Sequence, residues 1–176
     1  MDRTGKAIAE YHALPEESGR RRDLVASLGR SLDQRPDDEG VLDFLIAVAA
    51  DHEDLDLARV EATKALRLWP PADPDLRRRA GSALRAALSH PDEDLVRQYA
   101  AMALAPYADD PGVHEALADA VLGDEDRLVR DNALAALSEA GPDERRAGVL
   151  HRLAEDTTLR HEALRILTAW GRAPAA

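Results

Sequence analysis

Apolar residues recur at intervals of three and four positions along the chain, as in Leu95, Tyr99 and Met102. This spacing is typical of the buried face of an α-helix, and no segment shows a sustained alternation with β-branched residues. Short segments rich in acids or proline, such as 35–38 and 109–111, separate the apolar stretches and favour helix starts. The pattern predicts ten helices, near residues 4–14, 19–34, 38–50, 54–69, 73–89, 92–107, 111–122, 125–140, 143–155 and 157–170.

A short motif, Arg-x-x-Ala-x-x-Ala-Leu, recurs in register along these helices. The intervals between its arginines are 30 to 38 residues, which accommodates two helices and two turns. Each repeat is therefore expected to be a helical hairpin that buries its apolar face only by stacking on its neighbours. The copies begin at Arg59, Arg97, Arg130 and Arg160, and a weaker first copy begins at Arg21.

The segment Asp126-x-x-Val129-Arg130 resembles the first helix of short bacterial HEAT repeats. Glu93-x-x-Val96-Arg97 and Asp156-x-x-Leu159-Arg160 are near variants, and the resemblance covers residues 54–170 well and 19–50 poorly. It implies an all-α, right-handed superhelix of about four to five stacked hairpins, with second helices lining a concave groove used for binding. It also implies that Arg97, Arg130 and Arg160 pair with acids of the same or a neighbouring repeat.

Residues 36–70 also resemble a tetratricopeptide repeat, because Pro36 and Pro70 lie 34 residues apart. Leu45 and Ala58 stand at signature positions of that family, whereas its glycine position holds Ile46. Both families consist of stacked helix pairs. The HEAT interpretation is preferred because its motif continues to the C-terminus.

These repeats predict one α-solenoid domain over residues 1–176. Residues 1–18 form an N-terminal cap helix, residues 157–171 form a C-terminal capping helix, and the repeats span 19–53, 54–91, 92–124 and 125–156. The last helix is expected to leave Trp170, Leu167 and Leu164 partly exposed, so that the protein is a monomer or a weak homodimer through this helix.

Composition restricts the chemistry. The chain has no cysteine, which excludes disulfides, thiolate catalysis and cysteine-bound zinc. Its formal net charge is −11, and residues 89–176 carry 17 acids against 9 lysines or arginines. Such a field repels nucleic acid and attracts a basic protein partner.

The longest apolar run, residues 44–50, is far shorter than the roughly 20 residues of a membrane span. Residues 1–14 also lack an apolar stretch of signal-peptide length, so we expect a cytoplasmic protein. Arginine greatly outnumbers lysine and alanine is abundant, which indicates a bacterial source.

No catalytic or metal-binding motif is present. The acidic pairs and triplets lie at expected helix starts, where capping explains them. A phosphate-binding glycine loop and a Gly-x-Ser-x-Gly motif are both absent. The six histidines are scattered, with no His-Glu-x-x-His pattern. The sequence predicts no enzymatic activity, metal or cofactor.

The outward positions of the second helices are the candidate binding residues. Their charges are mixed, and in a superhelix they line one groove; they are Asp43, Arg78, Arg85, Glu115, Asp119, Arg145 and Arg152. The sequence therefore predicts a non-catalytic protein-interaction module, with an inhibitor or immunity-type protein that neutralises a basic toxin as its specific form. The alternatives are a HEAT-like nucleic-acid-binding or DNA glycosylase-type protein, and an accessory subunit of a chromophore lyase.

Overall fold

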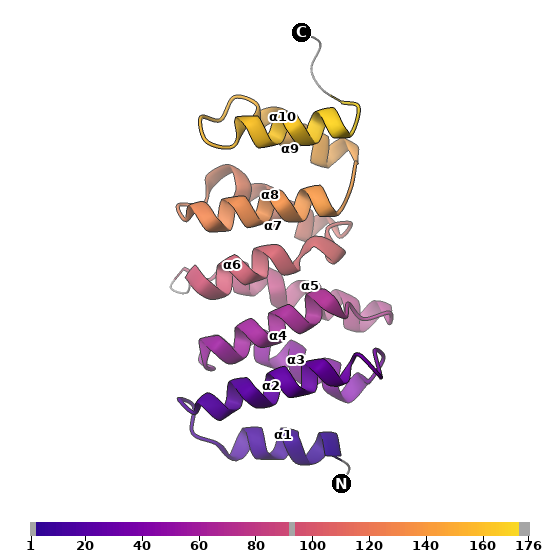
Figure 1. The fold of residues 1–176 in the computed structure, drawn as a ribbon, viewed down its shortest axis with the longest axis vertical. Coiled ribbons are helices and arrows are strands. Elements are labelled where there is room, and N and C mark those ends of the chain that lie inside the picture. The colour runs from indigo at the N-terminus through magenta and orange to yellow at the C-terminus, as the bar shows by residue number, and fades with distance from the viewer. Residues whose placement is uncertain (1–2, 92–93, 173–176) are drawn as a thin grey trace.

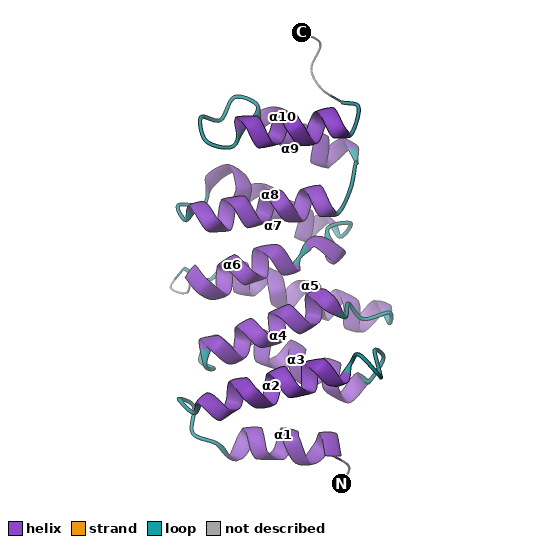
Figure 2. Ribbon diagram, viewed as in Figure 1, coloured by secondary structure: helices purple, strands orange, loops and turns teal. Residues whose placement is uncertain are grey.

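The computed structural model describes residues 3–91 and 94–172. Every regular element in these residues is a helix, and they contain no strand (Figure 2). The α-helices are α1 (Arg3–Ala13), α2 (Gly19–Ser31), α3 (Glu39–Ala50), α4 (Asp56–Leu68), α5 (Pro74–Leu88), α6 (Asp94–Ala103), α7 (Pro111–Gly123), α8 (Arg127–Glu139), α9 (Glu144–Leu153) and α10 (Arg160–Ala169), and a 3-10 turn, η1 (Ala105–Tyr107), follows α6.

The helices stack in two rows (Figure 1). The even-numbered helices from α2 to α10 form one row, and the odd-numbered helices from α3 to α9 lie behind it. Neighbours in the first row pack directly from α2 to α8, whereas α5 and α7, like α7 and α9, contact each other more sparsely. The rows are joined by close packing of α3 on α4, of α5 on α6 and of α7 on α8, each of which links the second helix of one predicted repeat to the first helix of the next. The predicted all-α solenoid of stacked helix pairs is confirmed.

One continuous apolar core runs through the stack, from Tyr11 in α1 to Leu167 in α10. The first alanine of each motif is fully buried between first helices, as Ala62, Ala100 and Ala133 show. A methyl side chain lets two helix backbones approach closely, so these alanines set the spacing of the first row. A core built from leucine, alanine and valine is thus sufficient for a chain with so few aromatic residues.

Pro106 divides the predicted helix 92–107. Positions 92 and 93, including Glu93 of the motif, lie outside the described residues. The helix α6 ends at Ala103, and the chain continues as η1. Proline has no N–H to donate, and its ring clashes with the carbonyl four residues earlier, so the predicted continuation to residue 107 is wrong. The resulting turn places Pro106 and Tyr107 beside α5, where they form one end of the candidate site.

The predicted ladder forms at Arg97 and Arg130, and Arg21 of the weaker first copy makes similar contacts, with the Leu14 carbonyl at 3.0 Å and Asp54 at 2.9 Å. The Nε of Arg97 donates to the carbonyl of Leu88 at 3.2 Å, and its guanidinium pairs with Asp124. Arg130 repeats this arrangement one repeat later: Nε lies 2.9 Å from the Val121 carbonyl, and Nη2 lies 2.5 Å from Asp156. Arg97 and Arg130 therefore each bind the end of the preceding second helix and an acid in the loop that follows the next. Arg160 is exposed and makes no such bond within the described residues.

The expectation for the last helix is partly wrong. Leu164 and Trp170 are half-buried, as predicted, but Leu167 is fully buried, because its side chain points into the core under α10. The apolar surface that was expected to support a homodimer is correspondingly smaller.

Candidate binding groove

The helix α5 presents one apolar and one polar face because its apolar residues follow the helical period. Asp73 caps its N-terminus by accepting hydrogen bonds from the N–H groups of Asp75 and Leu76, and Pro74 occupies the first turn. Leu76, Ala80 and Leu84 point into the core. The opposite face is consequently exposed and carries Arg78, Ser82 and Arg85.

The neighbouring helix α7 begins in the same way. The Asp110 carboxylate accepts hydrogen bonds from the N–H groups of Gly112, at 2.9 Å, and Val113, at 3.1 Å. Val113, Leu117 and Val121 are buried, which leaves Glu115 and Asp119 exposed on the side that faces solvent.

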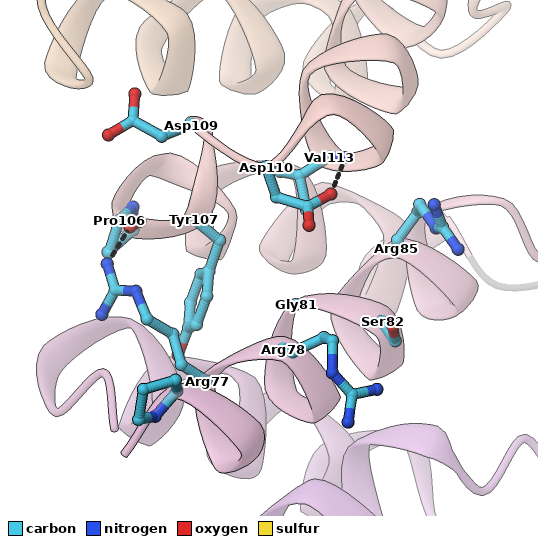
Figure 3. Close-up of a pocket in the computed structure, with 11 residues that line it drawn as sticks. Arg77, Arg78, Gly81, Ser82, Arg85, Pro106, Tyr107, Asp109, Asp110 and Val113 are labelled. Carbon is cyan, nitrogen blue, oxygen red and sulfur yellow. Dashed lines mark hydrogen bonds between the residues drawn. The ribbon is translucent and has the colours of Figure 1, made fainter. Parts of the chain in front are cut away.

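A pocket of about 240 Å³ lies between the start of α5, η1 and the start of α7 (Figure 3). We call it the Gly81 pocket. Its apolar wall is the ring of Tyr107, whose hydroxyl donates to the Leu66 carbonyl at 2.8 Å. Burial of that hydroxyl raises the pKa of Tyr107, so the hydroxyl stays protonated and the side chain is neutral. The lining residues are Pro74, Arg77, Arg78, Gly81, Ser82, Arg85, Pro106, Tyr107, Asp109, Asp110 and Val113.

A wider hollow of about 820 Å³ continues between the C-terminal halves of α5 and α7, and we call it the acidic hollow. Arg85 and Ser82 line both spaces, so the two form one groove, the α5–α7 groove. The acids Glu115, Asp119 and Glu125 line the hollow on the α7 side. The groove thus has arginines on its α5 wall and carboxylates on its α7 wall.

Most of the arginines near the groove are already paired. Arg77 donates to the carbonyls of Pro71 and Pro106 and lies 5.2 Å from the Tyr107 ring centroid, and Arg78 pairs with Asp75. Arg85 differs, because its guanidinium makes no hydrogen bond or ion pair within the described residues. Glu115 and Asp119 also make no ion pair there. These three side chains are therefore available to a partner.

Four of the seven predicted binding residues line this groove: Arg78, Arg85, Glu115 and Asp119. The other three are exposed but line neither part of it. Asp43, on α3, pairs with Arg79 at 2.6 Å, while Arg145 and Arg152 lie on α9. The seven residues are distributed over α3, α5, α7 and α9, and the groove brings together only those of α5 and α7.

Three residues that shape the groove were not predicted from the sequence: Gly81, Arg77 and Tyr107. A glycine in the middle of a predicted helix was a usable signal, since glycine destabilises helix interiors. The contact between Arg77 and Tyr107 carried no sequence signal, because it depends on where η1 places the ring after Pro106.

Two buried polar side chains, Arg146 of α9 and His114 of α7, lie where these helices pack together. Arg146 is buried and reaches Asp109 at 3.1 Å, and its Nε donates to the Gly141 carbonyl at 2.8 Å. His114 is also buried, and its Nδ1 has no hydrogen-bond partner within residues 3–91 and 94–172. Burial and then the nearby Arg145 and Arg146 lower the pKa of His114, so the imidazole is neutral at pH 7. These contacts hold α9 against α7, and one of them reaches the groove, because Asp109 also lines the Gly81 pocket.

The described residues contain no group of three or more His, Asp or Glu side chains that could bind a metal ion. None of the described helices is both long and apolar enough to span a membrane. The groove offers an apolar pocket, one unpaired guanidinium and several carboxylates, which is a set of groups suited to binding.

Comparison with known proteins agrees with this architecture. The pattern that defines the HEAT repeats matches residues 81–168, half of the chain, and includes the segment from Gly81 in α5 to Thr168 in α10. The match does not include residues 36–70, where the resemblance to tetratricopeptide repeats stays a prediction. A search of curated proteins found no match. With its stacked helix pairs, its arginine ladder and this match, the chain belongs to the HEAT-repeat family.

Proposed function

We propose that this protein is a non-catalytic interaction module that holds a partner protein in the α5–α7 groove. HEAT repeats are commonly protein-interaction modules, and the family is typically a non-enzymatic scaffold. One observation carries the proposal: Arg85, Glu115 and Asp119, which make no ion pair within residues 3–91 and 94–172, face the same continuous groove. A groove lined by unpaired charges fits a partner that supplies the opposite charges.

The stack supplies rigidity. The helices α5 and α7 are each packed on first-row helices, α6 and α8, that contact one another directly. The charged side chains of the groove are therefore presented at fixed spacing, which reduces the entropy lost when a partner binds. The mechanism is the presentation of a preformed surface, without a chemical step.

The charge of the molecule supports a partner with basic residues. The net charge is −11, and carboxylates form the larger part of the unpaired groups in the groove. Long-range attraction of this kind accelerates association with a basic protein and repels nucleic acid. An inhibitor or immunity-type protein that covers a basic target is the specific form of the proposal, and its binding should weaken as salt is raised.

Affinity capture with matched variants tests the proposal. Arg78→Glu with Arg85→Glu, and Glu115→Lys with Asp119→Lys, should each reduce recovery of the native partner from cell extract by about tenfold or more. The control reverses charge on exposed first-row residues, with Lys64→Glu and Arg127→Glu, and should recover the partner unchanged. Recovered proteins are quantified by mass spectrometry, and thermal unfolding verifies that each variant is folded. Equal recovery by groove and control variants would show that the partner binds elsewhere.

A further inference from the structure

Gly81 stands in the middle of α5, where an alanine would stabilise the helix. Packing does not require a glycine at this position. A Cβ on Gly81 would lie 3.5 Å from Val113 Cγ2 and 3.6 Å from Tyr107 Cδ1, which are ordinary contact distances. The contrast is Gly29 in α2, where a Cβ would lie only 2.8 Å from that of Ala65. The absence of a side chain at position 81 thus keeps the floor of the pocket open (Figure 3).

Arg85 stands next to this pocket with an unoccupied guanidinium. Its Nη1 lies so close to Gly112 that a Cβ there would be 2.2 Å away. The guanidinium therefore rests on the first turn of α7, between the Gly81 pocket and the acidic hollow. A planar guanidinium with no partner in the part of the chain that the structure describes is suited to a carboxylate, which it can bind through two hydrogen bonds.

The order of groups along the groove sets a spacing for a ligand. Gly81 and Arg85 are four residues apart on α5, roughly 6 Å at the rise of an α-helix. Gly112, under the Arg85 guanidinium, and Asp119 are seven residues apart on α7, roughly 10 Å. An extended peptide advances roughly 3.3 Å per residue, so these steps correspond to about two and three peptide residues.

We infer that the α5–α7 groove binds an extended peptide segment of the partner with the pattern apolar-x-acid-x-x-base. The apolar side chain enters the Gly81 pocket against Tyr107, the carboxylate pairs with Arg85, and a lysine or arginine lies against Glu115 and Asp119. This inference rests on the proposed function and specifies the segment that the groove would hold. Charge complementarity carries it, because the acid and the base of the peptide each meet an unpaired group of opposite sign.

Nuclear magnetic resonance tests the inference with defined peptides. The probe is Gly-Ser-Leu-Ser-Glu-Ser-Ser-Lys-Ser-Gly, together with the same residues in reversed order, because the groove fixes the order of groups but not the direction of the peptide. The amide signals of Gly81 and Gly112 in the ¹⁵N-labelled protein should shift with one of the two, with a Kd of about 1 mM or tighter. A peptide with its Glu and Lys exchanged should bind at least about tenfold more weakly. If neither order shifts these signals, the inference is wrong.

Two variants locate the peptide. Gly81→Ala should keep or raise the thermal midpoint while it weakens peptide binding about tenfold, since its methyl group fills the pocket floor. Arg85→Gln should weaken binding by a similar factor, and Arg30→Gln, which removes another exposed and unpaired arginine far from the groove, should leave it unchanged. Unaltered binding by Gly81→Ala would overturn the assignment of the pocket. If groove variants abolish capture of the native partner while neither peptide binds, the proposed function stands and this inference fails.

Discussion

Two helix-interior glycines show how single side chains control this stack. Gly29 is buried where α2 crosses α4, and any Cβ there would overlap that of Ala65. Gly148 lies on the exposed face of α9, where a Cβ would meet no atom within 4 Å. The same residue type is therefore required for close packing at one position and is a cost to helix stability at the other.

Gly29→Ala should lower the free energy of unfolding by about 1–3 kcal/mol, because α2 must shift away from α4 to admit the methyl group. Gly148→Ala should raise it by roughly 0.5–1 kcal/mol through helix propensity alone. Urea denaturation followed by circular dichroism measures both. A Gly29→Ala variant as stable as the original protein would show that the two helices can separate without loss.

At the residue level, periodicity predicted the solvent-facing positions of the second helices, whereas Leu95, which the apolar spacing assigned to a buried face, is exposed. All seven predicted binding residues are exposed, because one face of each second helix is fixed by its buried leucines and alanines. Periodicity could not predict which of them share a hollow. That depends on the wide separation of α5 and α7, and on Tyr107, which stacks against a residue 30 positions earlier.

At the level of elements, the existence of all ten helices could be read from the sequence, and their ends only in part. Asp73, Asp110 and Asp126 each cap a helix by accepting backbone hydrogen bonds, so acidic breaks located these starts. The end of α6 was missed because the apolar pattern continues past Ala103 while Pro106 prevents the helix from doing so. Proline overrode periodicity at Pro106, which lines the pocket between α5 and α7.

The ladder between repeats can be tested at Arg130. The backbone N–H of Leu159, then Arg130, then the N–H of Thr158 lower the pKa of Asp156 to about 2. Arg130→Gln should raise this pKa toward the ordinary value of 3.8 but not fully, because the backbone donors remain. Carboxyl ¹³C titration measures it. The variant should also lose roughly 1–3 kcal/mol of stability at pH 7, since the Val121 carbonyl and Asp156 lose a charged partner.

The sign of the pH dependence follows from the lowered pKa. An ionised Asp156 stabilises the folded state above pH 3.8, and this contribution is lost as the pH falls toward 2. Arg130→Gln should therefore lose less stability than the original protein over this interval. Arg127→Gln, which removes an exposed arginine 3.6 Å from Asp131, serves as the control and should change stability by less than about 0.5 kcal/mol. Equal acid sensitivity in all three proteins would exclude the ladder as its source.

At the level of the whole molecule, each helix pair depends on its neighbours. The core is continuous from α1 to α10, but the contacts of any one helix reach only the adjacent pairs. The stability of such a stack is approximately a sum of repeat and interface terms. A defect in the centre therefore acts on two sets of neighbours, and a defect at one end acts on one.

Two fully buried leucines allow this difference to be measured. Leu104 lies between α6 and η1 in the middle of the stack, and Leu167 lies in α10 at its end. Each replacement by alanine should cost about 2–5 kcal/mol locally, since both leave a cavity. Native-state hydrogen exchange should then show that Leu104→Ala lowers protection from α4 to α8, whereas Leu167→Ala lowers it only in α9 and α10. A uniform loss of protection across all helices in both variants would mean that the chain unfolds as one unit. The groove between α5 and α7 would then depend on the integrity of the whole stack, and not only on the four helices that pack on α5 and α7, which are α3, α6, α8 and α9.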